Sequence, residues 1–139
     1  MSERAFLDTN VLVYAYDRHD SRKQQTAQSL LTSALLMESG VVSSQILGEF
    51  FVVATQKIKD PLAPEEAEDI IHSLSALPVV FIDAGLVLRA LDTVKTYRIA
   101  YWDALVIAAA ERAGCVKVLS EDLNAGQEYH GMQVVNPFR

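Results

Sequence analysis

The spacing of hydrophobic positions changes several times along the chain, and each change predicts a new element. Short apolar, β-branched runs predict strands over residues 4–8, 40–44, 78–83, 116–120 and 132–136. Longer stretches with helical spacing predict helices over residues 20–38, 45–56, 65–77, 84–98 and 102–114. Because strands alternate with helices, we expect an α/β fold, a three-layer α/β/α sandwich with a central, mostly parallel sheet.

Length and composition narrow the class of protein. A chain of 139 residues suits one domain, so we expect residues 1–139 to form a single unit. Half of the residues are hydrophobic, which argues against a disordered protein. The net charge of −6 argues against a protein that coats nucleic acid by bulk charge. It leaves room for an enzyme of nucleic acids, since bound metal ions reverse the sign of an acidic pocket.

The expected location is the cytoplasm. Cys115 is the only cysteine, so no internal disulfide can form, which suits a reducing compartment. The start "MSERAF" is charged and then runs into Asp8, which is unlike a secretory signal. The uncharged apolar stretch 104–110 is far shorter than the roughly 20 residues of a membrane helix, so no membrane association is expected.

Four acidic residues stand at positions that suggest chemistry. Asp8 and Asp122 follow the first and fourth predicted strands, and α/β sheets bind ligands at the carboxyl ends of their strands. Asp103 lies at a helix start, and Glu49 lies beside the apolar stripe of its helix. Each also has a simpler explanation: Asp8 and Asp103 suit helix caps, Asp122 suits a loop, and Glu49 suits a solvated helix edge.

Taken together, these carboxylates point to a metal site. They come from separated regions, and no lysine or arginine is their neighbour in sequence. Ionised carboxylates that share a cleft need a counter-charge. The histidines are scattered and lack the spacing of a zinc site. An all-oxygen site suits Mg²⁺ or Mn²⁺, and a water bound to such an ion can attack a phosphodiester.

Several motifs resemble those of a known family. The stretches are "FLDTNVLVYAYD", "SSQILGEFFVV", "YWDALVIAAAERAGCVKVLSEDL" and "GMQVVNPF". In order and context they resemble a PIN domain, and within that family the toxin ribonucleases of VapBC-type toxin–antitoxin pairs. The resemblance runs from Ala5 to Phe138. It implies an α/β/α sandwich and a metal-dependent endoribonuclease that leaves a 5′-phosphate and a 3′-hydroxyl.

The resemblance also implies a role for each matching residue. The family's acidic quartet falls on Asp8, Glu49, Asp103 and Asp122. The three aspartates are then expected to hold Mg²⁺ or Mn²⁺, and the glutamate to orient or deprotonate the attacking water. Asn10 and Ser120 match the family's supporting polar residues. Glu121 has two readings, since it either faces away from the site or joins its outer shell.

The expected partners are an RNA substrate, a cognate antitoxin whose C-terminal segment lies in the acidic groove, and a second copy of the chain. Tyr97, Arg98 and Tyr101 are candidates for RNA contact near the mouth of the site, although a solvated helix end explains them equally well. Trp102 is expected to pack against the core rather than stack on a base, since tryptophan is highly buried on average.

Other functions remain as alternatives. The same fold could process RNA without an antitoxin. A signalling receiver domain would accept phosphate on Asp83, but it wants an acidic pair after the first strand, where this chain has Asp8 alone. A haloacid-dehalogenase-type phosphatase wants D-x-D where this chain reads Asp8-Thr9-Asn10. A catalytically silent binding module is disfavoured because all four acidic residues are present.

Overall fold

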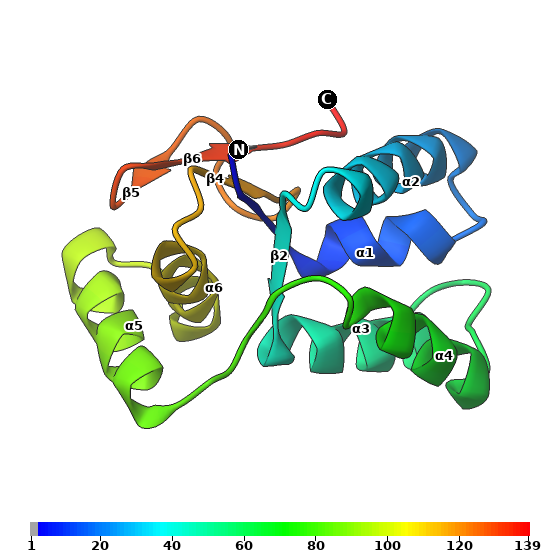
Figure 1. Cartoon of the computed structure of the whole chain (residues 1–139), viewed down its shortest axis with the longest axis horizontal. Helices are drawn as coiled ribbons and strands as arrows, with labels where there is room; N and C mark the ends of the chain where they lie inside the picture. The colour runs from blue at the N-terminus through cyan, green and yellow to red at the C-terminus, as the bar shows by residue number, and fades with distance from the viewer. Residues whose placement is uncertain (1–2) are drawn as a thin grey trace.

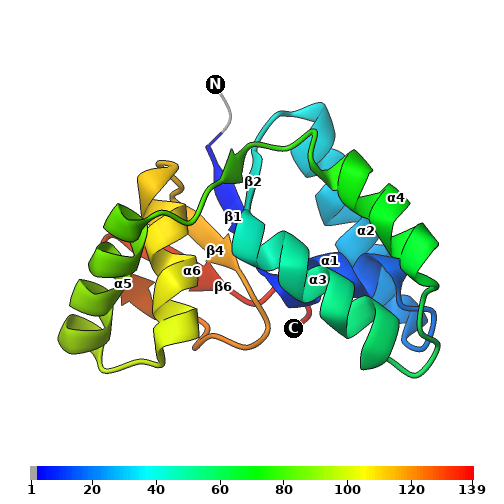
Figure 2. The same ribbon diagram turned by 90° about the horizontal axis from the view of Figure 1, so that it is seen from below.

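The computed structural model describes residues 3–139, and a six-stranded sheet runs through its centre (Figures 1 and 2). The strands are β1 (Ala5–Leu7), β2 (Gly40–Ser43), β3 (Val79–Val80), β4 (Lys117–Leu119), β5 (Glu128–Tyr129) and β6 (Met132–Val135). Their order across the sheet is β3-β2-β1-β4-β6-β5. All neighbours pair in parallel except β5, which runs antiparallel to β6.

Helices cover both faces of this sheet. They are α1 (Thr9–Tyr16), α2 (Ser21–Leu36), α3 (Ser44–Gln56), α4 (Pro64–Leu74), α5 (Ala84–Tyr97) and α6 (Tyr101–Arg112). Helices α1 to α4 gather on one side, and α5 with α6 on the other (Figure 1). This split follows from the strand order, because right-handed crossovers from β1 to β2 and from β3 to β4 run in opposite directions across the sheet. The predicted α/β/α sandwich is confirmed.

One strand was not expected from the sequence. Strand β5 has two residues and pairs with β6 through a hairpin whose turn residues are His130 and Gly131. Both turn residues have positive φ, 50° and 84°, the backbone that suits the right-handed twist of a two-residue hairpin. So short a strand leaves no alternating pattern, and only its pairing with β6 defines it.

Two deeply buried elements hold the site in place. Strand β1 has helices on both faces, and all three of its residues are buried. Helix α6 is buried continuously from Ala104 to Ala110, and its alanines let it pack closely on α5 and the sheet. Burial of a side chain such as Phe6 or Leu105 contributes about 1.5–3 kcal/mol each. The residues that follow β1 and begin α6 are therefore carried on rigid supports.

No helix described between residues 3 and 139 combines the length and the apolar character needed to cross a lipid bilayer.

Candidate active site

Asp8 lies where β1 ends and α1 begins, and its carboxylate is only 8% exposed. Its Oδ1 accepts a hydrogen bond from the backbone N–H of Thr9 at 2.8 Å, so Asp8 caps α1. Its Oδ2 accepts a bond of 2.6 Å from the hydroxyl of Ser120, which follows β4. Asp8 is therefore a helix cap and also part of a polar contact between two parallel strand ends.

Ser120 is the fully buried link in that contact. While its hydroxyl donates to Asp8, its oxygen accepts bonds from the backbone N–H groups of Asp122 and Leu123, at 3.1 and 3.2 Å. The loop after β4 is thus tied to the end of β1 through one side chain. This arrangement brings the predicted supporting serine into the site.

Asn10 fixes the same loop from the first turn of α1. Its Nδ2 donates to Oδ2 of Asp122 at 3.1 Å, and its Oδ1 accepts from the backbone N–H of Glu121 at the same distance. Asp122 itself is exposed, so its remaining oxygen faces the solvent side of the site. Asn10 was expected to partner the first aspartate, Asp8, but its side chain bonds to Asp122 and to the backbone of Glu121.

Glu49 approaches from α3, the helix after β2, and is half-buried. Its Oε2 accepts a bond of 2.7 Å from the hydroxyl of Thr9, and its Oε1 accepts one of 3.0 Å from Nε2 of Gln45. The sequence did not single out Thr9 or Gln45. A threonine beside Asp8 and a glutamine one helical turn before Glu49 were the available signals.

Asp103 lies on α6, near enough to Asp122 and Glu49 for their charges to act on it, and between residues 3 and 139 its carboxylate accepts no side-chain hydrogen bond. The sequence allowed Asp103 to be an N-cap, and this reading is wrong. The cap position is Ala100, the helix begins at Tyr101, and Asp103 lies within the first turn, where its charge suits the helix dipole. Its carboxylate is therefore free of a capping bond.

We call Asp8, Glu49, Asp103 and Asp122 the carboxylate cluster. Burial raises the pKa of Asp8 from 3.8 to about 6, against the opposing effect of its two hydrogen bonds, and the charges of Asp122 and Glu49 add to the increase. Burial also raises the pKa of Asp103, again helped by Asp122 and Glu49. Among residues 3–139, no lysine, arginine or histidine forms an ion pair with any member.

The chemistry of the cluster fits a hard divalent cation. All of its donor atoms are carboxylate oxygens, and it lacks the positive charge that would hold them ionised. In the described part of the chain, no three His, Cys, Asp or Glu side chains are already close enough to hold an ion. Like charges keep the carboxylates apart, so a cation would have to draw them together.

Glu121 belongs to a separate contact. Its carboxylate accepts bonds of 2.6 Å from both Nζ of Lys23 and the hydroxyl of Tyr14. Burial alone would raise the pKa of Glu121, but these two bonds lower it below its usual value. The Glu121 carboxylate therefore binds Tyr14 and Lys23 rather than a member of the carboxylate cluster, and it secures the loop that carries Asp122, although Glu121 lines the same cleft.

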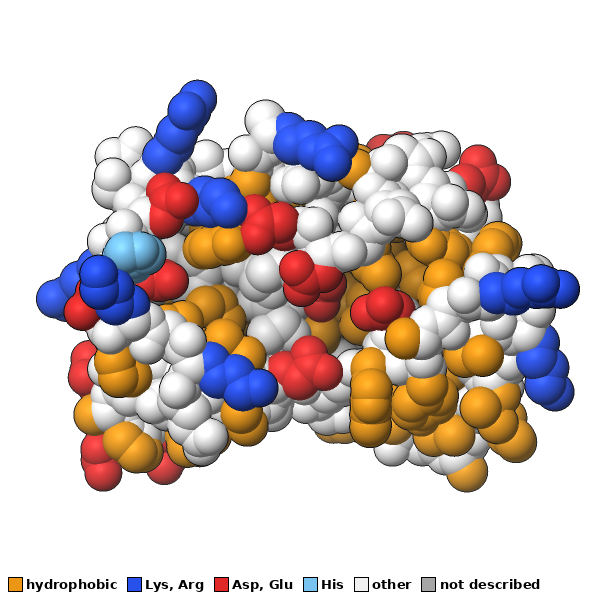
Figure 3. Space-filling model, turned by 180° about the vertical axis from the view of Figure 1, so that it is seen from behind, with side chains coloured by type: hydrophobic (Ala, Val, Ile, Leu, Met, Phe, Trp, Pro, Cys, Tyr) orange, Lys and Arg blue, Asp and Glu red, His pale blue; other side chains and the backbone are white. Residues whose placement is uncertain are grey.

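A cleft of about 540 Å³ opens beside the cluster. Its charged lining residues are both acidic and basic: Asp17, Asp20, Glu49, Glu121 and Asp122, with His19, Lys57 and Lys59. Val13, Val53 and Ile58 supply apolar surface. Figure 3 looks toward this side of the molecule, where several acidic side chains gather around the centre and acidic and basic side chains lie together to the left of them. The cleft therefore carries acidic and basic side chains together, with acidic ones in the majority.

A second hollow lies on the other side of Glu49, lined by Gly48, Val52 and Trp102 among others. Trp102 is 64% exposed, and its ring meets that of Tyr101 edge-on at 4.9 Å. The expectation that Trp102 packs against the core is wrong. It sits at the second position of α6, whose buried face begins two residues later at Ala104.

Tyr97 and Arg98 lie at the end of α5, and Tyr101 begins α6. Tyr97 accepts a bond of 2.9 Å from the backbone N–H of His130, and its ring packs on that of Tyr129. Arg98 is exposed in the left-handed conformation that ends α5. Contact between these residues and RNA stays a prediction.

Asp83, the residue that a receiver domain would phosphorylate, is engaged elsewhere. Its Oδ1 accepts from the backbone N–H of Leu86 at 2.8 Å and caps α5, and Arg112 binds both of its oxygens. These bonds lower the pKa of Asp83. The geometry gives no support to a phosphate-accepting role for this residue.

Comparison with known proteins places the fold. The chain is similar in structure to the toxin VapC20 of Mycobacterium tuberculosis, described as cleaving the sarcin–ricin loop, with a TM-score of 0.66, 18% identity, and coverage of 85% of this chain and 91% of that one. It is also similar to a chain of a toxin–antitoxin complex from Klebsiella pneumoniae (TM-score 0.67, 18% identity, coverage 96% and 97%). DNA-bound VapBC from Salmonella typhimurium gives a TM-score of 0.66 at the same identity and coverage. No curated protein matches. The PIN domain model matches residues 5–127, and the chain therefore belongs to the PIN domain family.

Proposed function

We propose that this protein is a metal-dependent endoribonuclease. One observation carries the proposal. The carboxylate cluster gathers four acidic side chains at the carboxyl ends of β1 and β4 and on α3 and α6, and no basic side chain neutralises it. A stable fold that places unpaired carboxylates together gains from a bound cation. Membership of the PIN domain family supports phosphodiester hydrolysis as the reaction.

In this mechanism Asp8, Asp103 and Asp122 would hold Mg²⁺ or Mn²⁺. Bound there, the ion would supply an activated water and stabilise negative charge on the phosphate in the transition state. Ser120 and Asn10 hold the aspartates beside β1 and β4 in place, through the bonds at 2.6 and 3.1 Å.

Glu49 would orient the attacking water and accept its proton. Its two oxygens are held by Thr9 and Gln45, at 2.7 and 3.0 Å, so the carboxylate is fixed before the substrate arrives. The pocket next to it at Gly48 is open, since a Cβ at that position would meet nothing within 4 Å.

The biological role we propose is that of the toxin in a toxin–antitoxin pair. The fold is shared with VapC toxins at 18% identity over most of both chains, which supports but does not by itself assign that role. A cognate antitoxin segment would lie in the cleft and block the carboxylate cluster. The alternative is a PIN-fold nuclease that processes RNA without an antitoxin. Co-expression with the product of the adjacent reading frame separates the two, because only an antitoxin suppresses growth arrest.

We also propose a homodimer built on an exposed apolar face. Val52, Phe81 and Trp102 are 40%, 75% and 64% exposed. The three lie on neighbouring segments, because Val52 and Trp102 line one hollow and Ser44, in the same hollow, accepts a bond from the backbone N–H of Ile82, next to Phe81. Light scattering should give twice the chain mass, and Val52→Glu should give a monomer.

The test of the proposed activity is cleavage of mixed RNA. We expect cleavage with Mg²⁺ or Mn²⁺, none with EDTA, and none by Asp8→Ala or Asp103→Asn. Cleavage that survives EDTA and both substitutions would refute the metal mechanism. An enzyme that cleaves only a few RNAs could leave mixed RNA intact. Expression in cells tests such an enzyme, because the wild type should arrest growth and Asp8→Ala should not.

A further inference from the structure

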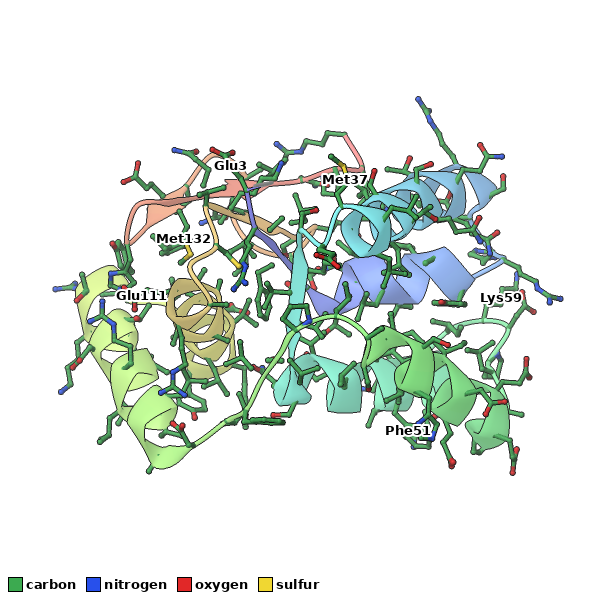
Figure 4. The ribbon with its side chains drawn as sticks, viewed as in Figure 1. Glu3, Met37, Phe51, Lys59, Glu111 and Met132 are labelled. Atoms are coloured by element: carbon green, nitrogen blue, oxygen red, sulfur yellow. The ribbon has the colours of Figure 1, made fainter. Side chains whose placement is uncertain are left out.

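Helices α3 and α6 each carry one member of the carboxylate cluster, and they lie on opposite sides of β2. Figure 4 shows this arrangement through Phe51 of α3 and Glu111 of α6, which stand on either side of that strand. Glu49 belongs to α3 and Asp103 to α6. Helix α3 packs mainly on α1 and α4, whereas α6 packs mainly on α5. Helix packing therefore ties each carboxylate to its own side of the sheet.

The amide of Gln45 joins the two helices. Its Nε2 donates to Oε1 of Glu49 at 3.0 Å, within α3, and to the backbone carbonyl of Trp102 at 3.3 Å, on α6. In the described part of the chain, no other hydrogen bond and no ion pair runs between α3 and α6. The carbonyl of Trp102 lies at the start of a helix that is buried continuously from Ala104 to Ala110, so it is a rigid acceptor.

The two acceptors also dictate how the Gln45 amide is turned. Its Oε1 is buried and has no hydrogen-bond partner between residues 3 and 139. Buried polar atoms are nearly always paired, so an unpaired one needs a specific cause. An amide turned the other way would direct Oε1 at the Glu49 carboxylate and the Trp102 carbonyl, which are acceptors and would repel it. Gln45 therefore leaves its oxygen unpaired while both hydrogens of Nε2 are used.

Without this amide, Glu49 would be held from one side only. The remaining bond, from the hydroxyl of Thr9 to Oε2, is 2.7 Å long and leaves Oε1 without a donor. A glutamate side chain can occupy several staggered rotamers, and the neighbouring position Gly48 offers no side chain to restrict it. The like charges of the cluster also repel the Glu49 carboxylate. One bond is a weak restraint against these effects.

We propose that Gln45 is a positioning residue, which fixes the Glu49 carboxylate by linking it to the backbone of α6. Thr9 and Gln45 each hold one oxygen, so the direction in which Glu49 meets the attacking water is set before RNA binds. Gln45 acts on the reaction through Glu49 and contacts neither the phosphate nor the metal. The inference rests on the proposed ribonuclease function and adds to it the residue that orients the base.

The test is single-turnover cleavage of mixed RNA at saturating Mn²⁺ by Gln45→Met, whose side chain keeps the length of glutamine and lacks its donors. We expect the maximal rate to fall about 10-fold, because misplacing a catalytic group by about 1 Å can cost about 100-fold. The RNA concentration that gives half the maximal rate should stay within about twofold of the wild type. The dissociation constant for Mn²⁺, measured by calorimetry without RNA, should also stay within about twofold.

The matched control is Gln28→Met, which removes another glutamine bond between two helices. Nε2 of Gln28 donates to the backbone carbonyl of Ala15 at 2.9 Å and joins α2 to α1, without touching the carboxylate cluster. Its maximal rate should stay within about twofold of the wild type. Urea unfolding of both variants checks that each is folded.

A double variant separates an action through Glu49 from a general loosening of α3. In a Glu49→Ala background the Gln45 amide has no carboxylate to hold, so Gln45→Met should change the remaining rate by less than about twofold.

Several results would overturn the inference. They are an unchanged rate in Gln45→Met, an equal loss in Gln28→Met, a weakened Mn²⁺ affinity that accounts for the loss, and the full loss in the Glu49→Ala background. Each leaves the proposed nuclease activity standing. A wild type without metal-dependent cleavage would instead remove that activity, and the role of Gln45 with it.

Discussion

Two groups of acidic side chains in this protein have opposite surroundings. The carboxylate cluster has no basic partner, and burial raises the pKa of Asp8 to about 6. On the α5–α6 side, Arg89 binds both oxygens of Glu111 at 2.7 and 2.8 Å, and Arg112 binds both oxygens of Asp83 at 2.8 and 3.1 Å. These bonds lower the pKa of both acids. We call Glu111 and Asp83 with their arginines the paired carboxylates.

The difference separates structural from functional acidity. In the paired carboxylates, the cation that completes each acid is part of the chain, so folding alone satisfies it. In the carboxylate cluster, folding brings acids together and leaves them without a cation, which costs stability. A protein keeps such an arrangement where a ligand supplies the missing charge. Whether an acidic side chain has a basic partner within the chain therefore indicates whether its role is structural or functional.

The largest effect is expected from removing a charge in the carboxylate cluster. Asp8→Asn should lower RNA cleavage by at least about 100-fold, because it removes a buried metal ligand that acts on the transition state. Glu111→Gln, the matched change in the paired carboxylates, should leave the rate within about twofold since it lies outside the cleft. Rates measured at saturating Mn²⁺ would test this. Equal losses of cleavage rate in Asp8→Asn and Glu111→Gln would show that the carboxylate cluster has no special role in activity.

For the free energy of unfolding, the larger loss is expected in the paired carboxylates. Arg89→Met leaves Glu111 half-buried without its partner and also removes a contact with Nδ1 of His130. We expect a loss of about 1–2 kcal/mol in the free energy of unfolding by urea, reduced from the full burial cost because Arg89 is 40% exposed. Arg112→Met is the control at the more exposed pair, and it should cost less. A larger cost for Arg112→Met would show that exposure does not govern these pairs.

The two groups should also respond to pH in opposite directions. The folded protein binds a proton on Asp8 more readily than the unfolded chain, since the pKa of Asp8 is about 6 when folded and 3.8 otherwise. In EDTA, stability should therefore rise by about 1 kcal/mol from pH 7 to pH 5. Below about pH 4 it should fall, as protonation breaks the lowered-pKa acids Glu111 and Asp83 from their arginines. Urea unfolding at each pH measures the rise and the fall, and the rise should shrink in Asp8→Asn to the part contributed by Asp103, whose pKa is also raised.

The smallest effect is expected at Glu121, a paired acid next to the unpaired cluster. Glu121→Gln keeps an acceptor for Tyr14 but loses the charge that binds Lys23. Because this contact secures the loop that carries Asp122, we expect a two- to fivefold rise in the Mn²⁺ concentration that gives half-maximal cleavage, with little change in the maximal rate. A fall in the maximal rate alone would show instead that Glu121 acts within the cluster.

Much of this arrangement could be predicted from the sequence. The period of apolar positions indicated every strand except β5, and the position of Asp8 after the first strand predicted its place at a sheet edge. Glu49 could be singled out because a glutamate beside an apolar helical stripe needs a partner. These signals can be found in the sequence because short runs of residues determine whether a segment forms a strand, a helix or a helix cap.

Other features needed the folded chain. The contact of Thr9 with Glu49 spans 40 positions, and that of Asp83 with Arg112 spans 29. No local pattern distinguishes a carboxylate that will meet an arginine from one that will not. Trp102 was expected in the core. The orientation of α6 in the fold instead buries Ala104 and leaves Trp102 exposed.

The sequence by itself determined the α/β architecture and the residues able to form an oxygen-ligand site, because both depend on residue type and on spacing along the chain. The tertiary structure decided which acids stay unpaired. It also placed Thr9 of α1 against Glu49 of α3, at 2.7 Å, although the two residues lie far apart in the sequence. Electrostatic complementarity depends on distance through space, and the fold alone sets that distance.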